Sequence, residues 1–331
     1  MSDIDNHLEI YRERPCQLRW KVPAFCNNDW IALSLLAMSD NLGFGRPFDI
    51  VFGAPQNLWQ GGRPALMRGP LSEDDLEKRF GAYDRFGVRC ALTLSRLDID
   101  PVTYKDPYGN LLLTVAERHG GQAIVTDDGL AAYIREQYPN LELVASFDRA
   151  LVDTAPGMPD HDDETAYYTR TLSRFDEVVV RCEYALDDAL IGQMSCDERA
   201  RTEVIVNQIC VPNCQRGREH VHAIEQWNEG LVGGPCQECF HGGVTANIKQ
   251  RLANNVLMTN RRINELASLG VGTFKIGGRN APIPKFLDLL GIYIYESSGA
   301  FVPMRVALSR QLTQYQAAHG SFAPYDLPFA V

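Results

Sequence analysis

Short apolar runs that alternate with amphipathic stretches dominate the pattern of the chain. Runs of four to eight residues rich in β-branched side chains predict buried strands, and the intervening stretches carry apolar residues at helical spacing. Ser72 precedes one such stretch and is expected to cap its helix. The predicted strands are 48–53, 88–95, 122–127, 141–146, 176–182, 202–207, 254–260 and 271–280.

Eight strands alternating with helices over roughly 240 residues predict a (β/α)₈ TIM-type barrel. The alternative is an open, doubly wound sheet, which often carries a Gly-rich phosphate loop after its first strand. The turn that begins at Gly53 reads GAPQNLW and lacks the G-x-G-x-x-G pattern, so the barrel is favoured. We assign residues 46–310 to the barrel, residues 1–45 to an N-terminal extension packed on it, and residues 311–331 to a C-terminal tail.

Composition and charge narrow the class of protein. An apolar content of 45% and a charged content of 22% are typical of globular chains. The net charge of -10 disfavours a nucleic-acid partner, because an acidic surface repels phosphates. The first residues do not resemble a signal peptide, and no apolar run reaches the roughly eighteen residues of a membrane span. We expect a cytoplasmic protein, in which clustered cysteines more often bind metal or act in catalysis than form disulfides.

Two close cysteine pairs lie in the segment 207–243, directly after the sixth predicted strand. Cys210 and Cys214 have three residues between them, and Cys236 and Cys239 have two. Four thiolates form a set that suits an iron–sulfur cluster or zinc, while a use without metal is a third alternative. Because barrel enzymes keep their active sites at the carboxyl ends of strands, we expect a cofactor used in chemistry at this position.

The other five cysteines are assigned separately. Cys90 and Cys182 lie inside predicted strands and are expected to be small core residues. Cys16, Cys26 and Cys196 are the candidates to replace one of the four clustered cysteines as a metal ligand. Cys26 is the first choice among them, because the segment FCNN is typical of an exposed loop.

Three segments resemble, in order, the motifs of a known family. RFDEVVVRCEYALDDALI (174–191), TEVIVNQICVPNCQRGREH (202–220) and GVGTFKIGGRN (270–280) are similar to strand motifs of the U-thirty-two peptidase family, also called collagenase-like peptidases. The segment 122–146 resembles the third and fourth strands of that family, and the whole resemblance covers about residues 45–290. This chain departs from the family at Cys182, where members have Glu after the arginine; Glu183 follows instead.

The resemblance implies a TIM-type barrel and a [4Fe–4S] cluster held by four cysteines, as in members that hydroxylate RNA bases or a quinone precursor without oxygen. We therefore expect an iron–sulfur enzyme whose redox chemistry, such as oxygen-independent hydroxylation, acts on a small or bound substrate. One alternative is a hydrolase or peptidase-like protein with structural zinc. Another alternative is a non-catalytic metal-binding subunit. The sequence leaves open whether the protein binds a partner protein or forms an oligomer.

Candidate site residues lie at the ends of the predicted strands. Lys275 and Arg279 close the eighth strand, where barrels often bind anions, and they suit a carboxylate-bearing co-substrate. Salt bridges with barrel carboxylates are the structural alternative for both. Asp127 and Glu183 are candidate acids or bases, with pairing to Arg or Lys as their alternative. Asn207 is expected to contact substrate or to hold the cysteine loop.

Two further groups complete the expected site. Asn57, Trp59 and Gln60 follow the first predicted strand and are expected to line a pocket, with Asn57 binding substrate. His220 and His222 follow the first cysteine pair. A histidine can replace a thiolate in a zinc site, but most such residues are surface groups.

Overall fold

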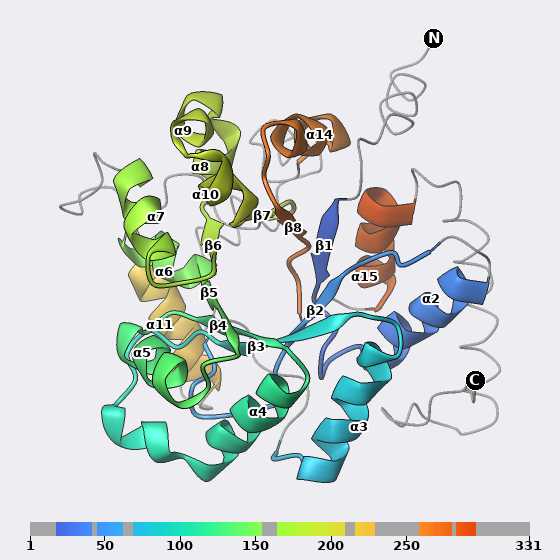
Figure 1. The fold of residues 1–331 in the computed structure, drawn as a ribbon, viewed down its shortest axis with the longest axis vertical. Coiled ribbons are helices and arrows are strands. Elements are labelled where there is room, and N and C mark those ends of the chain that lie inside the picture. Colours follow the sequence, from blue (N-terminus) through green and yellow to red (C-terminus); the bar gives the residue numbers. More distant parts are fainter. Residues whose placement is uncertain are drawn as a thin grey trace.

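The computed structural model describes residues 18–41, 45–61, 69–153, 164–208, 216–228, 258–279 and 283–295. Eight parallel strands close into a barrel, in which each strand pairs with its neighbours in sequence and β8 pairs with β1 (Figure 1). This confirms the predicted (β/α)₈ barrel. The strands are β1 (Arg19–Val22), β2 (Ile50–Gly53), β3 (Arg89–Leu94), β4 (Gln122–Val125), β5 (Glu142–Ala145), β6 (Glu177–Val180), β7 (Thr202–Ile205) and β8 (Thr273–Lys275).

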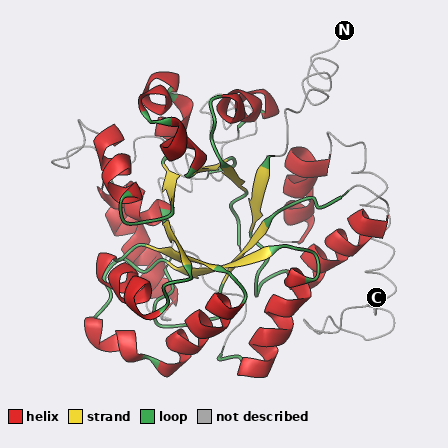
Figure 2. Cartoon of the chain, viewed as in Figure 1, coloured by secondary structure: helices red, strands yellow, loops and turns green. Residues whose placement is uncertain are grey.

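Helices surround the strands in a ring (Figure 2). The Ser72 side chain accepts a hydrogen bond from the Asp75 amide, which confirms the predicted cap of α3. The helices are α2 (Asp29–Asn41), α3 (Glu73–Asp84), η1 (Pro101–Lys105), α4 (Pro107–Arg118), α5 (Asp128–Gln137), α6 (Phe147–Asp153), α7 (Glu164–Leu172), α8 (Cys182–Leu186), α9 (Asp188–Gln193), α10 (Cys196–Ala200), α11 (Gly217–Asn228), α14 (Asn260–Ser268), α15 (Ile283–Leu290) and η4 (Gly291–Tyr295).

The first barrel strand lies inside the segment that the sequence assigned to an extension. Residues 19–22 pair with β2 through Lys21 and Ile50, and with β8 through Lys21 and Lys275. The proposed boundary at residue 46 is therefore wrong, because β1 and α2 are parts of the barrel. Its charged Arg19 and Lys21 alternate with Trp20 and Val22, so the run lacks the continuous apolar character of a strand such as β2, which reads IVFG.

The strand predicted at 254–260 is also corrected. Residues 254–257 lie outside the described residues, Met258 and Thr259 form a connection, and Asn260 begins α14. β7 pairs directly with β8, which leaves no place for a strand between them. The Met258 amide donates to the Val206 carbonyl, so this connection crosses the carboxyl end of β7.

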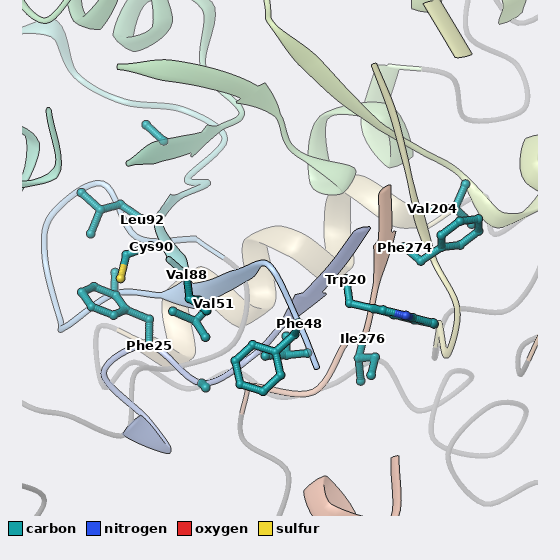
Figure 3. Close-up of a cluster of buried hydrophobic side chains, with 14 of the residues drawn as sticks. Trp20, Phe25, Phe48, Val51, Val88, Cys90, Leu92, Val204, Phe274 and Ile276 are labelled. Carbon is teal, nitrogen blue, oxygen red and sulfur yellow. The ribbon is translucent and has the colours of Figure 1, made fainter. Parts of the chain in front are cut away.

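Side chains that point outward from the strands form the main core against the helices. Trp20 packs on Phe274 with ring centroids 5.8 Å apart, and Phe25 contacts Phe80 edge-on at 4.8 Å. Cys90 lies in this layer, as predicted, 2% exposed (Figure 3). A second apolar cluster fills the middle of the barrel and consists of Ile50, Phe52, Ala91, Ile124, Val144 and Val179.

No helix in the described ranges is long and apolar enough to cross a membrane.

Candidate functional site

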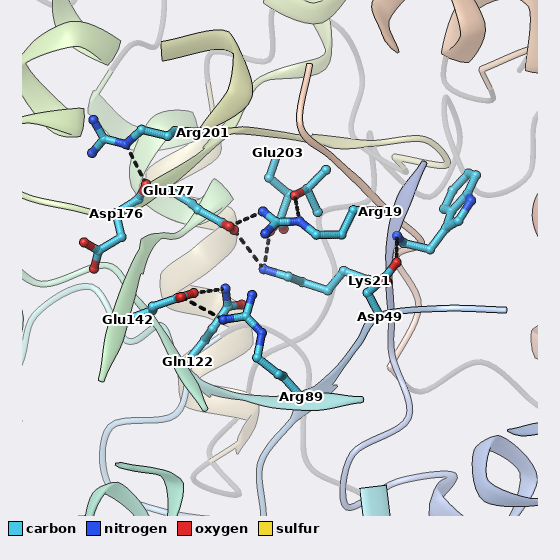
Figure 4. Close-up of polar contacts among 12 residues, drawn as sticks. Arg19, Lys21, Asp49, Arg89, Gln122, Glu142, Asp176, Glu177, Arg201 and Glu203 are labelled. Carbon is cyan, nitrogen blue, oxygen red and sulfur yellow. Dashed lines mark hydrogen bonds and ion pairs between the residues drawn. The ribbon is translucent and has the colours of Figure 1, made fainter. Parts of the chain in front are cut away.

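Charged side chains from β1, β6 and β7 meet inside the barrel (Figure 4), and Lys275 of β8 joins them. Lys21 forms an ion pair with Glu203, and Lys275 Nζ lies 2.9 Å from Glu203 Oε1. Lys21 Nζ is also 3.6 Å from Glu177 Oε2, and Arg19 pairs with Glu177. Burial raises the pKa of Glu203, but Lys21 and Lys275 outweigh that effect and lower it to about 2. Glu203 is therefore ionised at neutral pH and binds both ammonium groups.

Lys275 and Arg279 both lie in the barrel interior but differ in their contacts. Besides its ion pair with Glu203, Lys275 places Nζ 4.4 Å from the ring centroid of Phe52. Arg279 donates to the Thr93 hydroxyl and, over 3.0 Å, to the Gly61 carbonyl. Burial lowers the pKa of Lys275, and Glu203 opposes that shift. Lys275 thus makes the salt bridge that was the alternative to anion binding, whereas the printed contacts of Arg279 are to a hydroxyl and a carbonyl.

The other predicted strand-end residues also have local partners. Asp127 accepts hydrogen bonds from the Leu130 amide at 2.7 Å and the Tyr104 hydroxyl at 3.1 Å, so it caps α5. Glu183 lies 3.3 Å from Arg181. Asn207 donates to the Gly277 carbonyl and accepts from the Gly277 amide, so it links the ends of β7 and β8. The structure brings none of these three side chains into one cluster.

Helix α11 lies beside α6 and behind β4 and β5 in Figure 1. Val221 of α11 packs with Leu151 of α6 and with Leu97, which follows β3. The Glu225 carboxylate accepts a hydrogen bond from the Leu97 amide at 2.7 Å. Although α11 follows β7 in sequence, its contacts are at the carboxyl ends of β3 and β5. Helix α11 therefore lies at the mouth of the barrel, where barrel enzymes bind their substrates.

Two acidic residues at this mouth were missed by the sequence analysis. Burial raises the pKa of Asp148, against the opposing effects of Arg279, a Ser95 hydrogen bond and Lys275. Burial likewise raises the pKa of Glu225, and the charge of Asp148 adds to that shift. The position of Asp148, directly after the predicted strand 141–146, was a usable signal. Glu225 carried none, because only the position of α11 brings it to the mouth.

A cavity of about 370 Å³ opens beside Glu225, between the loops that follow β2 and β3 and helix α11. Asn57 and Gln60 line it, together with Arg96 and Glu225. The Asn57 side chain donates to the Pro55 carbonyl and accepts from the Trp59 amide, so it also shapes its own turn. Trp59 itself is fully buried and donates to the Thr103 carbonyl, so it belongs to the core and does not line the cavity.

All four clustered cysteines, Cys210, Cys214, Cys236 and Cys239, lie outside the described residues, as does Cys16. Cys26 is 2% exposed and adopts a φ of 60°, which contradicts its assignment to an exposed loop. Cys196 is exposed, in the first turn of α10. His220 and His222 both lie in α11, and His222 Nδ1 is 3.3 Å from Glu225 Oε2.

Comparisons with known proteins add likenesses to solved structures, and the one described below has low sequence identity. No protein-family model matches the chain, and no curated protein matches it. Among solved structures, a U32 peptidase, Mk0906, matches over 82% of this chain and 96% of its own, with 16% sequence identity and a TM-score of 0.43. At these values we infer neither family membership nor activity from the likeness.

Proposed function

We propose that the protein is an iron–sulfur barrel enzyme that acts on a small or bound substrate at the carboxyl ends of its strands. The observation that carries the proposal is the position of the two residues that flank the first cysteine pair in the sequence. Gln208, buried at the end of β7, precedes Cys210 by two positions. Gly217, which begins α11 at the mouth, follows Cys214 by three.

The four thiolates of Cys210, Cys214, Cys236 and Cys239 fit a [4Fe–4S] cluster, for which cysteine sulfur is the usual ligand. In the part of the chain that the structure describes, no group of three or more His, Cys, Asp or Glu residues could hold a metal ion. We therefore assign the cluster to the cysteines. Such a cluster would supply single electrons for redox chemistry, with oxygen-independent hydroxylation as the reaction that we propose.

The residues of the mouth would bind and orient the substrate. Arg279 and Lys275 add positive charge beside Asp148, and this favours a carboxylate-bearing co-substrate. A carboxyl group with a raised pKa holds its proton closer to neutral pH and can act as an acid or a base. We therefore propose Asp148 for proton transfer in place of Asp127 and Glu183, whose carboxylates cap a helix and pair with Arg181. Asn207 is proposed to hold the cysteine loop through Gly277.

Anaerobic purification followed by iron, sulfide and zinc analysis tests the cofactor. We expect a brown protein with an absorption band near roughly 400 nm that bleaches on reduction, as thiolate-bound clusters show. Serine in place of any one of the four clustered cysteines should lower the iron content. Cys196→Ser is the matched control, because Cys196 is exposed on α10, and its iron content should be unchanged.

A colourless protein without iron, prepared under strict exclusion of oxygen, contradicts the proposal. One zinc per chain, lost in the same serine variants, instead supports the hydrolase or peptidase-like alternative with a structural metal. If iron is present but Asp148→Asn and Arg279→Gln leave turnover unchanged, the cluster assignment stands and the assignment of the mouth as the reaction site fails.

A further inference from the structure

Helix α11 is joined to the loop after β3 by apolar contacts and by polar ones. Val221 packs with Leu97 and with Leu151 of α6, and these apolar contacts are independent of pH. The Leu97 amide also donates to Glu225 Oε1 at 2.7 Å. His222, which follows Val221 on the helix, adds a contact whose strength depends on a proton.

The imidazole ring of His222 lies between two carboxylates that belong to different elements. Its Nε2 is 3.4 Å from Asp98 Oδ2, in the loop after β3, and its Nδ1 is 3.3 Å from Glu225 Oε2, on α11 itself. An imidazolium attracts both carboxylates, whereas a neutral imidazole has no charge and only one N–H group to donate. A single proton therefore decides whether the ring joins the helix to the loop. The His222 side chain is 39% exposed, so it exchanges this proton with solvent.

Other charged groups also face this contact. Arg218 lies one turn before the ring on α11, with Nη1 3.9 Å from Asp98 Oδ2. Arg96, from the loop after β3, favours the ionised form of Glu225, while Asp148, from α6, favours the neutral form. Arginine stays charged at every pH at which a protein is folded, but histidine changes its charge between about pH 5 and 8. The charge of the ring is therefore the part of this contact that varies near neutral pH.

We propose that His222 is a pH-dependent latch that holds α11 against the loop after β3. While the ring is protonated, it links Asp98 to Glu225. As the pH rises and the ring loses its proton, the link is lost, and the apolar contacts and the hydrogen bond from the Leu97 amide remain. At acidic pH the link ends when Glu225, whose pKa is raised by burial, takes up a proton.

The latch acts on the cavity at the mouth. Glu225 lines that cavity, so α11 forms one of its walls. A helix that is held less firmly moves away from the loop more often, and the cavity is then open for a larger part of the time. The latch is independent of the iron–sulfur proposal, because no cysteine takes part in it.

Hydrogen exchange of the α11 amides, measured on the full-length protein at a series of pH values between about 5 and 8, tests the latch. Division of each exchange rate by the intrinsic rate at the same pH leaves the protection that the structure provides. We expect this protection to fall about two- to fivefold as His222 loses its proton, which is the size of effect that a partly exposed ion pair produces. NMR follows the titration of the ring, and its signal is assigned by its absence from His222→Gln.

Variants identify the groups of the latch. In His222→Gln the pH dependence of α11 protection should disappear, because no charge is gained or lost. Asp98→Asn should reduce it, because the ring then has one carboxylate partner instead of two. His119→Gln is the matched control. His119 also lies between two carboxylates, Glu77 and Asp84, but it joins α4 to α3, so α11 protection should keep its wild-type pH dependence.

Thermal unfolding of each variant verifies that it is folded before its exchange is interpreted. Protection of α11 that is constant across this pH range in the wild-type protein overturns the proposal. It is overturned equally if His222→Gln or Asp98→Asn keeps the full wild-type pH dependence, because the responsible group then lies elsewhere. Since exchange is measured without turnover or metal analysis, either proposal can fail while the other stands.

Discussion

Buried carboxylates in the ion cluster inside the barrel and at its mouth have pKa values that shift in opposite directions. In the ion cluster, the ammonium groups of Lys21 and Lys275 lower the pKa of Glu203 to about 2, despite its burial. At the carboxyl-terminal mouth, burial raises the pKa values of Asp148 and Glu225, although cations lie near both. The folded protein therefore favours the charged form of Glu203 and disfavours the charged forms of Asp148 and Glu225.

The difference separates charges that hold the barrel together from charges available for chemistry. Glu203 has ion pairs to two buried cations from β1 and β8, so the strands cannot separate without exposing or uncoupling charges. Asp148 lies near Glu225, which lines a cavity. Two neighbouring carboxyl groups with raised pKa values cost stability and are typical of functional sites. We therefore assign substrate binding and proton transfer to the mouth of the barrel and a structural role to the ion cluster.

The largest effect is expected from Glu203→Gln. The variant leaves the buried ammonium group of Lys275 without its ion pair and Lys21 with only the more distant Glu177, which costs about 3–5 kcal/mol of unfolding free energy. Urea denaturation measures the loss. Glu142→Gln is the control, because the pair of Glu142 with Arg89 is partly exposed and contributes about 0–1 kcal/mol. Equal losses in the two variants would show that the buried cluster does not stabilise the barrel.

The acid stability of the wild type tests the same cluster by titration. The pKa of Glu203 falls from an ordinary 4.5 to about 2 on folding. Its contribution is therefore fully present above pH 4.5 and is lost as the pH falls toward 2. The stability of Glu203→Gln should depend less on pH across this window. Denaturation midpoints of both proteins, measured at several pH values in this range, test this expectation. If the midpoints of the two proteins depend on pH equally, Glu203 does not stabilise the folded barrel through its ion pairs.

A smaller loss is expected from Gly272→Ala, just before β8. A Cβ atom at this position would lie 1.8 Å from the Ala200 carbonyl oxygen, so the backbone must shift at a cost of about 1–3 kcal/mol. Differential scanning calorimetry measures the loss. Gly81→Ala in α3, where a Cβ atom would meet nothing within 4 Å, should instead gain about 0.5–1 kcal/mol. A stable Gly272→Ala protein would show that this end of the barrel is loosely packed.

Asp148→Asn should have the opposite sign to Glu203→Gln. Because the pKa of Asp148 is raised on folding, its charge destabilises the folded protein at neutral pH, and removal of the charge should stabilise by about 0.5–2 kcal/mol. Urea denaturation at pH 7 measures the gain, and turnover should fall if Asp148 transfers a proton. A loss of stability would show that the charge of Asp148 stabilises the fold, as that of Glu203 does. The ion cluster and the mouth would then not differ in this respect.

The smallest effect is expected at the surface, where His119 joins α4 to α3. Its Nε2 lies 2.7 Å from Glu77 Oε2, and Nδ1 contacts Asp84. Burial lowers the pKa of His119, but the two carboxylates outweigh it and raise the pKa above 6.5. The stabilisation is therefore full below pH 6.5 and disappears as the pH rises through the raised value. His119→Gln should lose about 0.2–1 kcal/mol at pH 6 and almost nothing at pH 9, measured by thermal unfolding.

Apolar runs predicted most of the barrel because burial on both faces leaves a local signal in the sequence. β3 and β4 lie within the runs predicted at 88–95 and 122–127. β1 was missed because Arg19 and Lys21 point toward partners in the barrel, which makes its pattern resemble a polar segment. The predicted strand at 254–260 was wrong because a short apolar run such as VLM does not show whether a neighbouring strand is available.

The sequence predicted where the candidate site lies but not which side chains contact one another there. The carboxyl ends of the strands were the predicted place, and Asn57 and Gln60 do line the cavity there. The partners of Lys275 and Arg279 could not be predicted, because Glu203 and Thr93 are separated from them by 72 and 186 positions. Glu225 was hidden for the same reason, since its hydrogen bond to Leu97 spans 128 positions.

The sequence by itself determined the alternation of strands and helices, the caps and the cysteine pairs, because each depends on residues close together in the chain. The tertiary structure decided which charges meet. Closure of β8 on β1 joins Lys21 and Lys275 to Glu203, and the position of α11 at the mouth brings Glu225 to Arg96. Burial then sets the pKa of each carboxyl group, and burial is a property of the folded chain alone.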